Sequence, residues 1–291
     1  MKPPPFAYHD PTSLEEALEL LHRYGDDAKV LAGGQSLMPL LNFRLSSPTA
    51  LIDLNRIAAL AYIRHDDGQL RIGAMTRQRA VEFSLLVRDH LPLLHEATTL
   101  IGHLPIRTRG TVGGSLAHAD PAAEYPAVAM ALEAEFVLQK AGGTRVLRAE
   151  EFFVTYLTTA LASDEVLVEV RFPPSSPTSG WAFAEFAQRH GDFALAGVAA
   201  ALDANGEQCQ SVRLAAAGVG PTPLRLRAVE QILEQDGLTD QSIEAAAVRA
   251  AELVEPDSDL HASADFRRHL TKILTRRALR RAVARSRERR Q

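Results

Sequence analysis

Two pairs of adjacent glycines are the residues of this chain that point most directly to a chemistry. The first pair lies in residues 32–37 (AGGQSL) and the second in residues 111–115 (TVGGS). Adjacent glycines reach positive φ easily and carry no side chain to cover their backbone N–H groups. Successive bare N–H groups form a concave anion site. We therefore expect the N–H groups of Gly33, Gly34, Gly113 and Gly114 to hold one pyrophosphate from two sides, and pyrophosphate is the shared handle of FAD and NAD.

Neither glycine pair belongs to a standard nucleotide-binding motif. The chain has no G-x-G-x-x-G after a strand and no G-x-x-x-x-G-K-[ST], so neither a Rossmann fingerprint nor an ATP P-loop is supported. Taken alone, each pair is also typical of a tight turn between strands. The residues around the pairs must decide between these interpretations.

Longer stretches around both pairs resemble the flavoprotein subunits of the molybdenum hydroxylases, the family of xanthine dehydrogenase and carbon monoxide dehydrogenase. Residues 32–39 (AGGQSLMP) are similar to the first FAD-pyrophosphate loop of that family, and residues 106–121 (IRTRGTVGGSLAHADP) are similar to the second. The resemblance continues in order through 122–126, 152–153, 164–167 and 189–194. It covers nearly the whole chain.

The resemblance implies further contacts with a non-covalent FAD. A carboxylate accepts hydrogen bonds from two hydroxyls, which suits Glu124 as the partner of the ribityl or ribose part; alternatively it is a solvated acid at a helix start. Asp120 either takes part or opens the turn before the next proline. Leu161 is a core leucine on sequence alone, but in the family a leucine here covers the flavin ring. Arg189 lies in a loop expected beside that ring, where many members carry a lysine near Ala187.

Other polar residues near the two pairs have two interpretations each. Ser36 and Thr111 carry hydroxyls that either donate to phosphate or cap the local turn or helix. His118 and His103 flank the second pair as packed or hydrogen-bonding residues, or as points of covalent flavin attachment. We expect no catalytic acid or base and no metal site. The expected FAD contacts are Ala32, Gly33, Gly34, Gln35, Ser36, Leu37, Thr111, Gly113, Gly114, Ser115, His118, Asp120, Glu124, Leu161 and Arg189.

Composition places the chain among ordinary globular proteins of one large or two smaller domains. It has 291 residues, 46% of them hydrophobic, and a net charge of −4. The single cysteine, Cys209, excludes an intrachain disulfide and a cluster that needs about four thiolates. The start has no secretory h-region and no run is long enough for a membrane span, so we expect a cytoplasmic protein.

Patterns along the first part of the chain predict short alternating elements. Ser13 caps a helix from Leu14 to about Gly25, with Glu16 completing a capping box. The further elements expected, in chain order, are strands at 28–31 and 50–53, a hairpin at 62–72, helices at 76–86, 91–100 and 126–132, a second hairpin at 134–147, and a strand at 165–172.

A stretch rich in proline and serine, residues 173–180, marks a domain boundary. Beyond it, three strands (181–188, 194–202 and 211–219) precede three helices (223–235, 240–254 and 263 to about 288). Strands followed by helices favour an α+β fold. The resemblance implies a two-lobed PCMH-type FAD-binding domain at 1–175, then a C-terminal domain at 180–291 with a three-stranded antiparallel sheet packed on a helical bundle. The arginines of the last helix indicate a solvated face and, without interleaved aromatics, exclude nucleic acid.

The resemblance implies an electron-transfer subunit of a heterotrimeric complex that can itself dimerise. A small partner subunit carries [2Fe–2S] clusters, a large one holds the molybdopterin cofactor, and FAD passes electrons on to NAD, a quinone or oxygen. Two other interpretations stay open: a redox-inactive nucleotide-binding or scaffold module, and a self-sufficient flavin oxidoreductase. The sequence names neither the organic substrate nor the acceptor.

Overall fold

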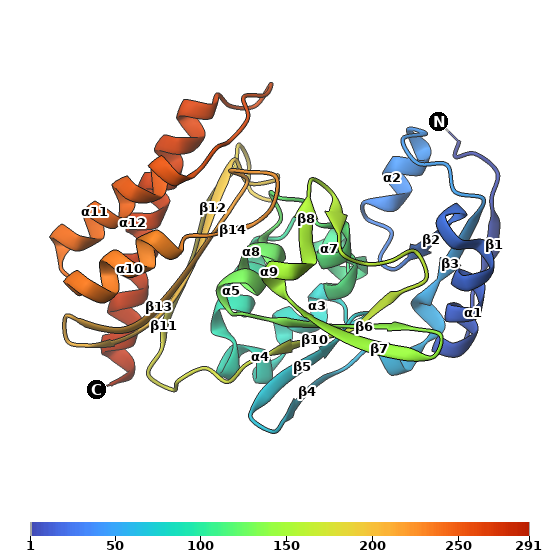
Figure 1. Cartoon of the computed structure of the whole chain (residues 1–291), viewed down its shortest axis with the longest axis horizontal. Helices are drawn as coiled ribbons and strands as arrows, with labels where there is room; N and C mark the ends of the chain where they lie inside the picture. Colours follow the sequence, from blue (N-terminus) through green and yellow to red (C-terminus); the bar gives the residue numbers. More distant parts are fainter. Residues whose placement is uncertain (1, 291) are drawn as a thin grey trace.

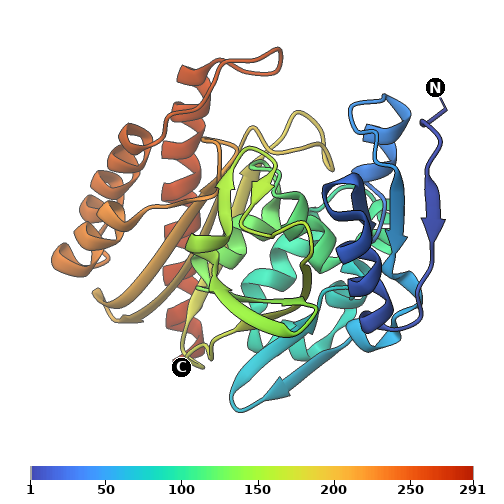
Figure 2. The ribbon, with the colours of Figure 1, turned by 45° about the vertical axis from the view of Figure 1, so that its right-hand side comes forward.

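The computed structural model describes residues 2–290 and shows three parts in a row, each built on its own sheet (Figure 1). The N-terminal part and the helices at the end of the chain lie at opposite ends of the molecule (Figure 2). The mixed α and β architecture, with a last sheet packed on helices, confirms the predicted fold class.

The N-terminal part is a parallel sheet of order β1-β3-β2 with one long helix against it. Ser13 caps that helix, because its Oγ accepts a hydrogen bond from Glu16 N at 3.2 Å. The helix packs its apolar side on the sheet, and Met75 and Val137 of the middle part close this core. Its elements are β1 (Ala7–His9), α1 (Leu14–Tyr24), η1 (Gly25–Asp27), β2 (Ala28–Leu31), α2 (Leu37–Asn42), β3 (Ala50–Asp53), η2 (Leu54–Arg56) and η3 (Ala58–Leu60).

The middle part is a five-stranded antiparallel sheet of order β4-β5-β10-β6-β7, covered by short helices. Its elements are β4 (Ile63–Asp66), β5 (Gln69–Gly73), α3 (Gln78–Phe83), α4 (Leu85–His90), α5 (Pro92–Leu100), α6 (Leu104–Arg109), α7 (Val112–His118), α8 (Glu124–Ala131), β6 (Glu135–Lys140), β7 (Gly143–Arg148), α9 (Ala149–Phe152), β8 (Phe153–Thr155), β9 (Thr158–Thr159) and β10 (Val166–Phe172).

Two local predictions for the middle part are wrong. The helix expected over 76–86 is two helices, because Ser84 breaks the first and caps the second by accepting from Val87 N at 3.3 Å. The second glycine pair was expected in a loop, yet it lies in the first turn of α7, whose N-cap is Thr111. The cap and the packing of the tertiary structure override the low helix propensity of glycine.

The third part is a sheet of order β11-β12-β13-β14 with helices on its outer face. Its elements are β11 (Gly180–Phe186), β12 (Ala196–Asn205), β13 (Gln208–Ala217), β14 (Leu224–Arg225), α10 (Arg227–Asp236), α11 (Asp240–Leu253) and α12 (Ala264–Arg289). The start of the helix expected over 223–235 is in fact the short edge strand β14.

Both faces of this third sheet are buried. Alternate residues such as Phe183, Ala199 and Ala215 join the core of the middle part, while their neighbours Ala182 and Ala200 pack against α10–α12. The sheet therefore joins two cores, since successive side chains of a strand point to opposite faces.

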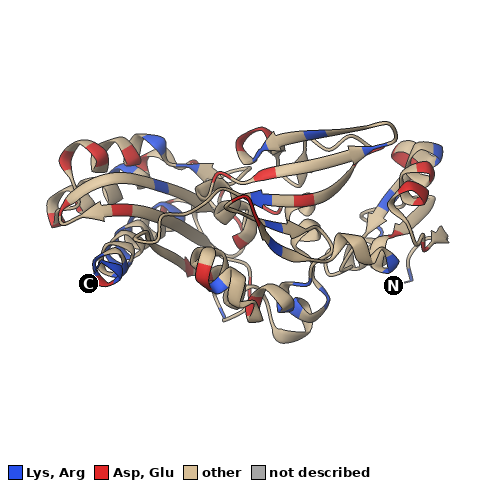
Figure 3. Ribbon diagram, turned by 90° about the horizontal axis from the view of Figure 1, so that it is seen from below, with Lys and Arg blue, Asp and Glu red and all other residues tan. Residues whose placement is uncertain are grey.

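The arginines of α12 form more ion pairs within the chain than the solvated face expected from the sequence would. Lys and Arg recur throughout α12, those near its C-terminal end are seen in Figure 3, and several of them reach carboxylates on other helices. Arg276 pairs with Glu244 at 3.1 Å, Arg280 with Asp240 at 2.9 Å, and Arg285 contacts Glu96 on α5. Much of this charge is used inside the chain.

Candidate functional site

The two glycine segments, 80 residues apart in sequence, touch in the structure. A Cβ added to Gly33 would lie 2.5 Å from the carbonyl oxygen of Arg109 and 2.8 Å from Gly110 Cα. A Cβ on Gly114 would lie 3.4 Å from Ala32 Cβ and 4.0 Å from Gly33 N. The N-terminal and middle parts thus meet here backbone against backbone, along a line that we call the glycine seam (residues 32–36 and 109–115).

The first glycine segment leaves its backbone donors free. Gly34 has a left-handed φ of 72°, which glycine adopts without strain. Within residues 2–290, the N–H groups of Gly33, Gly34, Gln35 and Ser36 have no acceptor. The Ser36 side chain makes no capping hydrogen bond to α2, so of its two possible roles the capping one is not used. Unsatisfied N–H groups of this kind are what an anion requires.

The second glycine segment uses its donors inside the fold. Val112 N donates to Thr76 O at 3.0 Å, Gly113 N to Ala74 O at 2.8 Å, and Gly114 N to the Thr111 hydroxyl at 3.0 Å. The expectation that Gly113 and Gly114 donate to a phosphate is therefore corrected, because the first turn of α7 has already satisfied these groups. Thr111 takes the capping role.

Glycine at 113 and 114 serves close approach instead. A Cβ on Gly113 would lie 2.5 Å from Ala74 Cβ and 2.8 Å from Ala74 O, which are fixed atoms of the core. A Cβ on Gly114 would meet the end of the Thr111 side chain at 2.7 Å and would otherwise point at the first segment. Gly113 thus permits packing on Ala74, whereas Gly114 avoids a clash with the capping hydroxyl of Thr111 and places no side chain against the first segment.

Glu124, at the first residue of α8, is a buried carboxyl rather than a solvated one. It is 7% exposed, and burial first, then the negative charge of Glu185, raises its pKa to about 8. A solvated acid at a helix start would behave in the opposite way. The alternative that placed Glu124 in solvent is wrong.

Glu185, on β11, was not anticipated as a site residue. Burial raises its pKa to about 7, and its Oε2 is buried without a hydrogen-bond partner among the described residues. It lies on the face of the third sheet that packs against the middle part, as Phe183 does. The alternation of β11 placed Glu185 on this face, but nothing in the sequence placed Glu124 opposite.

The segment between α7 and α8 is a tight turn. Ala119 has left-handed φ and ends α7, and Asp120 Oδ1 accepts a hydrogen bond from Ala122 N at 2.9 Å. This geometry supports the turn-opening role of Asp120. Burial lowers the pKa of His118, against the opposing charge of Asp120, so His118 is a largely neutral residue beside the seam.

Leu161 and Arg189, both expected beside the flavin ring, lie in two separate segments of the structure. Leu161 is half-buried against the middle core, and its N–H donates to Thr159 Oγ1 at 3.3 Å. Arg189 is exposed, in a loop whose Gly191 would place a Cβ 2.7 Å from His103 Cε1. The loop around residues 189–193 thus packs beside the start of α6.

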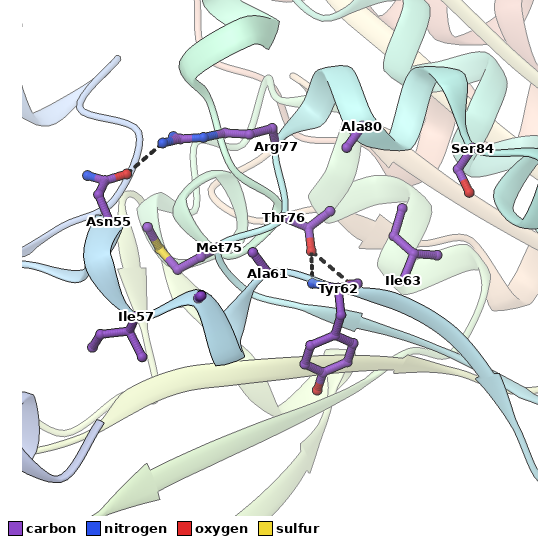
Figure 4. A pocket seen from close by; sticks show the side chains of 11 residues that line it. Asn55, Ile57, Ala61, Tyr62, Ile63, Met75, Thr76, Arg77, Ala80 and Ser84 are labelled. Atoms are coloured by element: carbon purple, nitrogen blue, oxygen red, sulfur yellow. Dashed lines mark hydrogen bonds between the residues drawn. The ribbon is translucent and has the colours of Figure 1, made fainter. Parts of the chain in front are cut away.

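Two polar residues that sequence reasoning missed lie next to the seam. Asn55 Nδ2 donates to Ala32 O at 2.9 Å, and the Arg77 guanidinium contacts both Asn55 Oδ1 and Arg109 O. They border a pocket of about 440 Å³ with mostly apolar walls, including Ile57 and Met75 (Figure 4). Because they lie 22 residues apart in sequence, no local periodicity could have indicated them.

Among residues 2–290, the structure offers neither a metal site nor a reactive thiol, nor a helix that could span a membrane. No group of three or more His, Cys, Asp or Glu side chains within residues 2–290 is arranged to hold a metal ion. Burial raises the pKa of the Cys209 thiol to about 11, which keeps it protonated. None of the described helices has the length and hydropathy that a membrane crossing requires.

Comparison with protein families matches almost the entire chain. Residues 4–175 match a model described as the FAD binding domain in molybdopterin dehydrogenase. Residues 181–282 match a model described as the CO dehydrogenase flavoprotein C-terminal domain.

Characterised proteins of similar sequence are dehydrogenase subunits. The chain is 43% identical to the 6-hydroxypseudooxynicotine dehydrogenase complex subunit alpha of Paenarthrobacter nicotinovorans, over 99% of this chain and 97% of that protein. It is 40% identical to the carbon monoxide dehydrogenase medium chain of Hydrogenophaga pseudoflava, over 98% and 99%.

Solved structures agree over the same length. A chain of carbon monoxide dehydrogenase from Hydrogenophaga pseudoflava superposes with a TM-score of 0.96 at 41% identity, covering 98% of this chain and 99% of that one. A chain of quinoline 2-oxidoreductase from Pseudomonas putida 86 gives a TM-score of 0.93 at 36% identity, covering 98% and 99%.

Proposed function

This chain belongs to the family of FAD-binding medium subunits of the molybdenum hydroxylases, and we propose that it relays electrons from a partner subunit through FAD to an external acceptor. The observation that carries the proposal is the glycine seam, where the N–H groups of the first segment have no acceptor among residues 2–290 and lie beside a second segment that carries no side chain at Gly114. Family membership makes the chain a subunit of an oxidoreductase with an FAD-binding domain.

The residues at the seam fit the pyrophosphate of FAD. The N–H groups of Gly33 to Ser36 would bind its oxygens, with the Ser36 hydroxyl as a further donor. Gly114 would leave room for it. Gly113 and Thr111 would support the site by holding the first turn of α7 in place.

The carboxyls of Glu124 and Glu185 fit the hydroxyl-bearing part of the cofactor. With pKa values raised to about 8 and about 7, both are partly protonated near neutral pH. A protonated carboxyl both donates and accepts, so it can satisfy a ribityl hydroxyl without adding charge. The Oε2 of Glu185, which has no partner among the described residues, would be satisfied in the same way.

The isoalloxazine ring of bound FAD supplies the redox chemistry, and the protein positions and tunes it. Leu161 from one side and the loop of Arg189 from the other would border the ring. The loop carries Arg189, which is exposed, as the available cation where a lysine is absent. No side chain of this chain needs to transfer a proton in the reaction.

The partner subunits are proposed from the cysteine content of this chain and from its relatives. One cysteine cannot ligate an iron–sulfur cluster, so electrons must enter from another subunit, a small one with [2Fe–2S] clusters. A large molybdopterin subunit would oxidise the substrate. Relatives named for caffeine and for carbon monoxide are 43% and 40% identical to this chain, so the substrate is set elsewhere in the complex. We place the complex in the cytoplasm and retain 1–175 and 180–291 as the two domains of the chain.

Anaerobic bleaching of the flavin tests the proposal. The purified chain should carry about one FAD, and candidate substrates (purines, aldehydes, N-heterocycles or carbon monoxide) should bleach it only when the iron–sulfur and molybdenum subunits are added. Rapid bleaching of the isolated chain would instead show a self-sufficient oxidoreductase. A chain that binds no flavin would be a redox-inactive module.

A further inference from the structure

A chain of hydrogen bonds links the two glycine segments on their carbonyl side. Arg77, at the N-cap of α3, donates from one nitrogen to Arg109 O and from the other to Asn55 Oδ1, the latter at 2.6 Å. Asn55 in turn donates to Ala32 O at 2.9 Å. The chain therefore runs from the carbonyl before Gly110 to the carbonyl before Gly33, and it crosses from the middle part to the N-terminal part.

Asn55 is itself held in place. Its backbone N–H donates to Asp53 Oδ1 at 2.8 Å, and the other oxygen of Asp53 accepts from the Tyr8 hydroxyl at 2.7 Å. Asp53 is the last residue of β3, the central strand of the N-terminal sheet. The side-chain amide of Asn55 is thus anchored to a strand that is paired on both sides.

Holding the Ala32 carbonyl fixes a donor on the opposite side. In a planar trans peptide the C=O and the next N–H point in opposite directions. When Asn55 binds Ala32 O, the N–H of Gly33 must point away from Asn55. Gly33 N is the atom that faces the missing side chain of Gly114, at 4.0 Å from where its Cβ would be.

The positive charge of the Arg77 guanidinium would favour an anion at the first glycine segment. Arg77 has no carboxylate partner among the described residues, and its two terminal nitrogens serve neutral oxygens. Burial and the neighbouring positive charge of Arg109 lower the pKa of Arg77, only partly offset by Asp53. The positive charge of Arg77, which Asp53 offsets only in part, thus lies on the carbonyl side of the first segment.

We propose that Arg77 and Asn55 form a clasp that sets the spacing of the two glycine segments and aims the Gly33 N–H at the pyrophosphate. They are positioning residues and touch no reacting atom. The inference rests on the proposed binding of FAD and adds residues that act on it from outside the cofactor contacts.

The test compares FAD affinity with stability of the FAD-free chain. Arg77→Met and Asn55→Ala should each weaken FAD about tenfold, since each removes hydrogen bonds that orient the seam. The double mutant should lose much less FAD affinity than the product of the two single losses, because either change breaks the same chain of hydrogen bonds. Arg77→Lys, which keeps the charge but loses the planar fork, should fall between wild type and Arg77→Met. Arg88→Met, which removes an exposed guanidinium paired only with its neighbour, should match wild type.

A phosphorus NMR spectrum of bound FAD supplies a readout that a general loss of stability would not move. The pyrophosphate resonances should shift in both clasp variants and not in Arg88→Met. Folded variants with unchanged FAD affinity and unchanged resonances would overturn the clasp while leaving the proposed function intact. The clasp would also be overturned by a double mutant whose loss of FAD affinity equals the product of the two single losses. An unaltered chain that binds no FAD would overturn the proposed function and the clasp with it.

Discussion

In the first glycine segment the N–H groups of Gly33 to Ser36 have no acceptor within residues 2–290, whereas in the second every N–H from Val112 to Gly114 is already used. Both segments contain the same dipeptide and both lie on one seam. The difference comes from the local structure around each pair. The first precedes the proline-containing helix α2, while the second lies inside a capped helix that packs on Ala74.

The comparison teaches that a glycine pair does not by itself reveal which property of glycine is used. At Gly34 it is the left-handed backbone, at Gly113 the close approach of two backbones, and at Gly114 the absence of a side chain beside Thr111 and the first segment. Each use predicts a different response to substitution.

The largest expected contrast is between Gly113→Val and Gly114→Val. Gly113→Val forces a branched side chain into Ala74, a fixed part of the core, so the protein should fold poorly, with a loss of about 3 kcal/mol or more. In Gly114→Val the new side chain meets the capping hydroxyl of Thr111 and then extends into the seam, so this variant should lose less stability than Gly113→Val and retain no FAD. Thermal unfolding and the flavin spectrum of the purified chains measure the two outcomes.

The pair is its own control, because the two variants differ by one position and insert the same side chain. If Gly114→Val folds and still holds stoichiometric FAD, the seam is not the pyrophosphate site. If Gly113→Val is as stable as wild type, its role in close packing is refuted.

Glu124→Ala measures how much of the FAD affinity comes from residues outside the two glycine segments. Removing a buried hydrogen-bonding carboxyl should weaken FAD by about 1.5–3 kcal/mol, or one to two decades. Isothermal titration of the FAD-free chain measures this change. Glu15, exposed in the first turn of α1, provides the control, and Glu15→Ala should bind FAD as wild type does. Unchanged affinity in Glu124→Ala would leave the glycine seam as the main source of binding.

The FAD-free chain should lose stability as the pH rises from about 5 to about 8. The folded pKa values of Glu124 and Glu185, about 8 and about 7, lie above the ordinary 4.5. Their contribution is therefore full below about pH 4.5 and is lost as the pH rises through the folded values, by on the order of 5 kcal/mol. Melting temperatures across this range measure the loss, and Glu185→Gln should flatten it. An equally steep decline in Glu185→Gln would show that other groups cause it.

The smallest effects should separate the two hydroxyls of the seam. Ser36→Ala should weaken FAD by about 0.5–1.5 kcal/mol with the stability of the FAD-free chain unchanged, because its hydroxyl has no capping role. Thr111→Ala should instead destabilise the FAD-free chain by about 0.5–2 kcal/mol, because it removes the N-cap of α7. Denaturant titration with and without FAD distinguishes the two. Equal effects of both variants on stability would remove the distinction between the segments.

Local patterns were enough to predict most elements of the fold. The strands Ala28–Leu31 and Ala50–Asp53 and the start of α1 at Leu14 are confirmed, because apolar runs, a serine cap and turn residues are signals carried within a few positions. The break at Ser84 carries a signal as well, since serine is a capping residue, but the apolar spacing on both sides of it also suits one continuous helix.

The site was less accessible to such reasoning. That Gly33 touches Arg109 and that Glu185 faces Glu124 depends on how separate lobes pack, which no local pattern contains. Helix α7 could not be recognised from propensity, since its first turn holds two glycines and is fixed by Thr111 and Ala74. The family resemblance predicted that both segments contact one pyrophosphate. It did not predict that, within residues 2–290, only the first glycine pair has free N–H groups.

Strands β12 and β13 of the third sheet meet the middle part largely through alanine side chains. Ala199 and Ala201 on β12 and Ala215 and Ala217 on β13 form this face, and α8 packs against both strands. Small alanine side chains let α8 approach these two strands closely, and this contact helps to set the positions of Glu124 on α8 and Glu185 on β11. The two halves that family models describe separately are therefore not interchangeable parts. A half exchanged with that of a relative would bring its own spacing, and the relative positions of Glu124 and Glu185 would change with it.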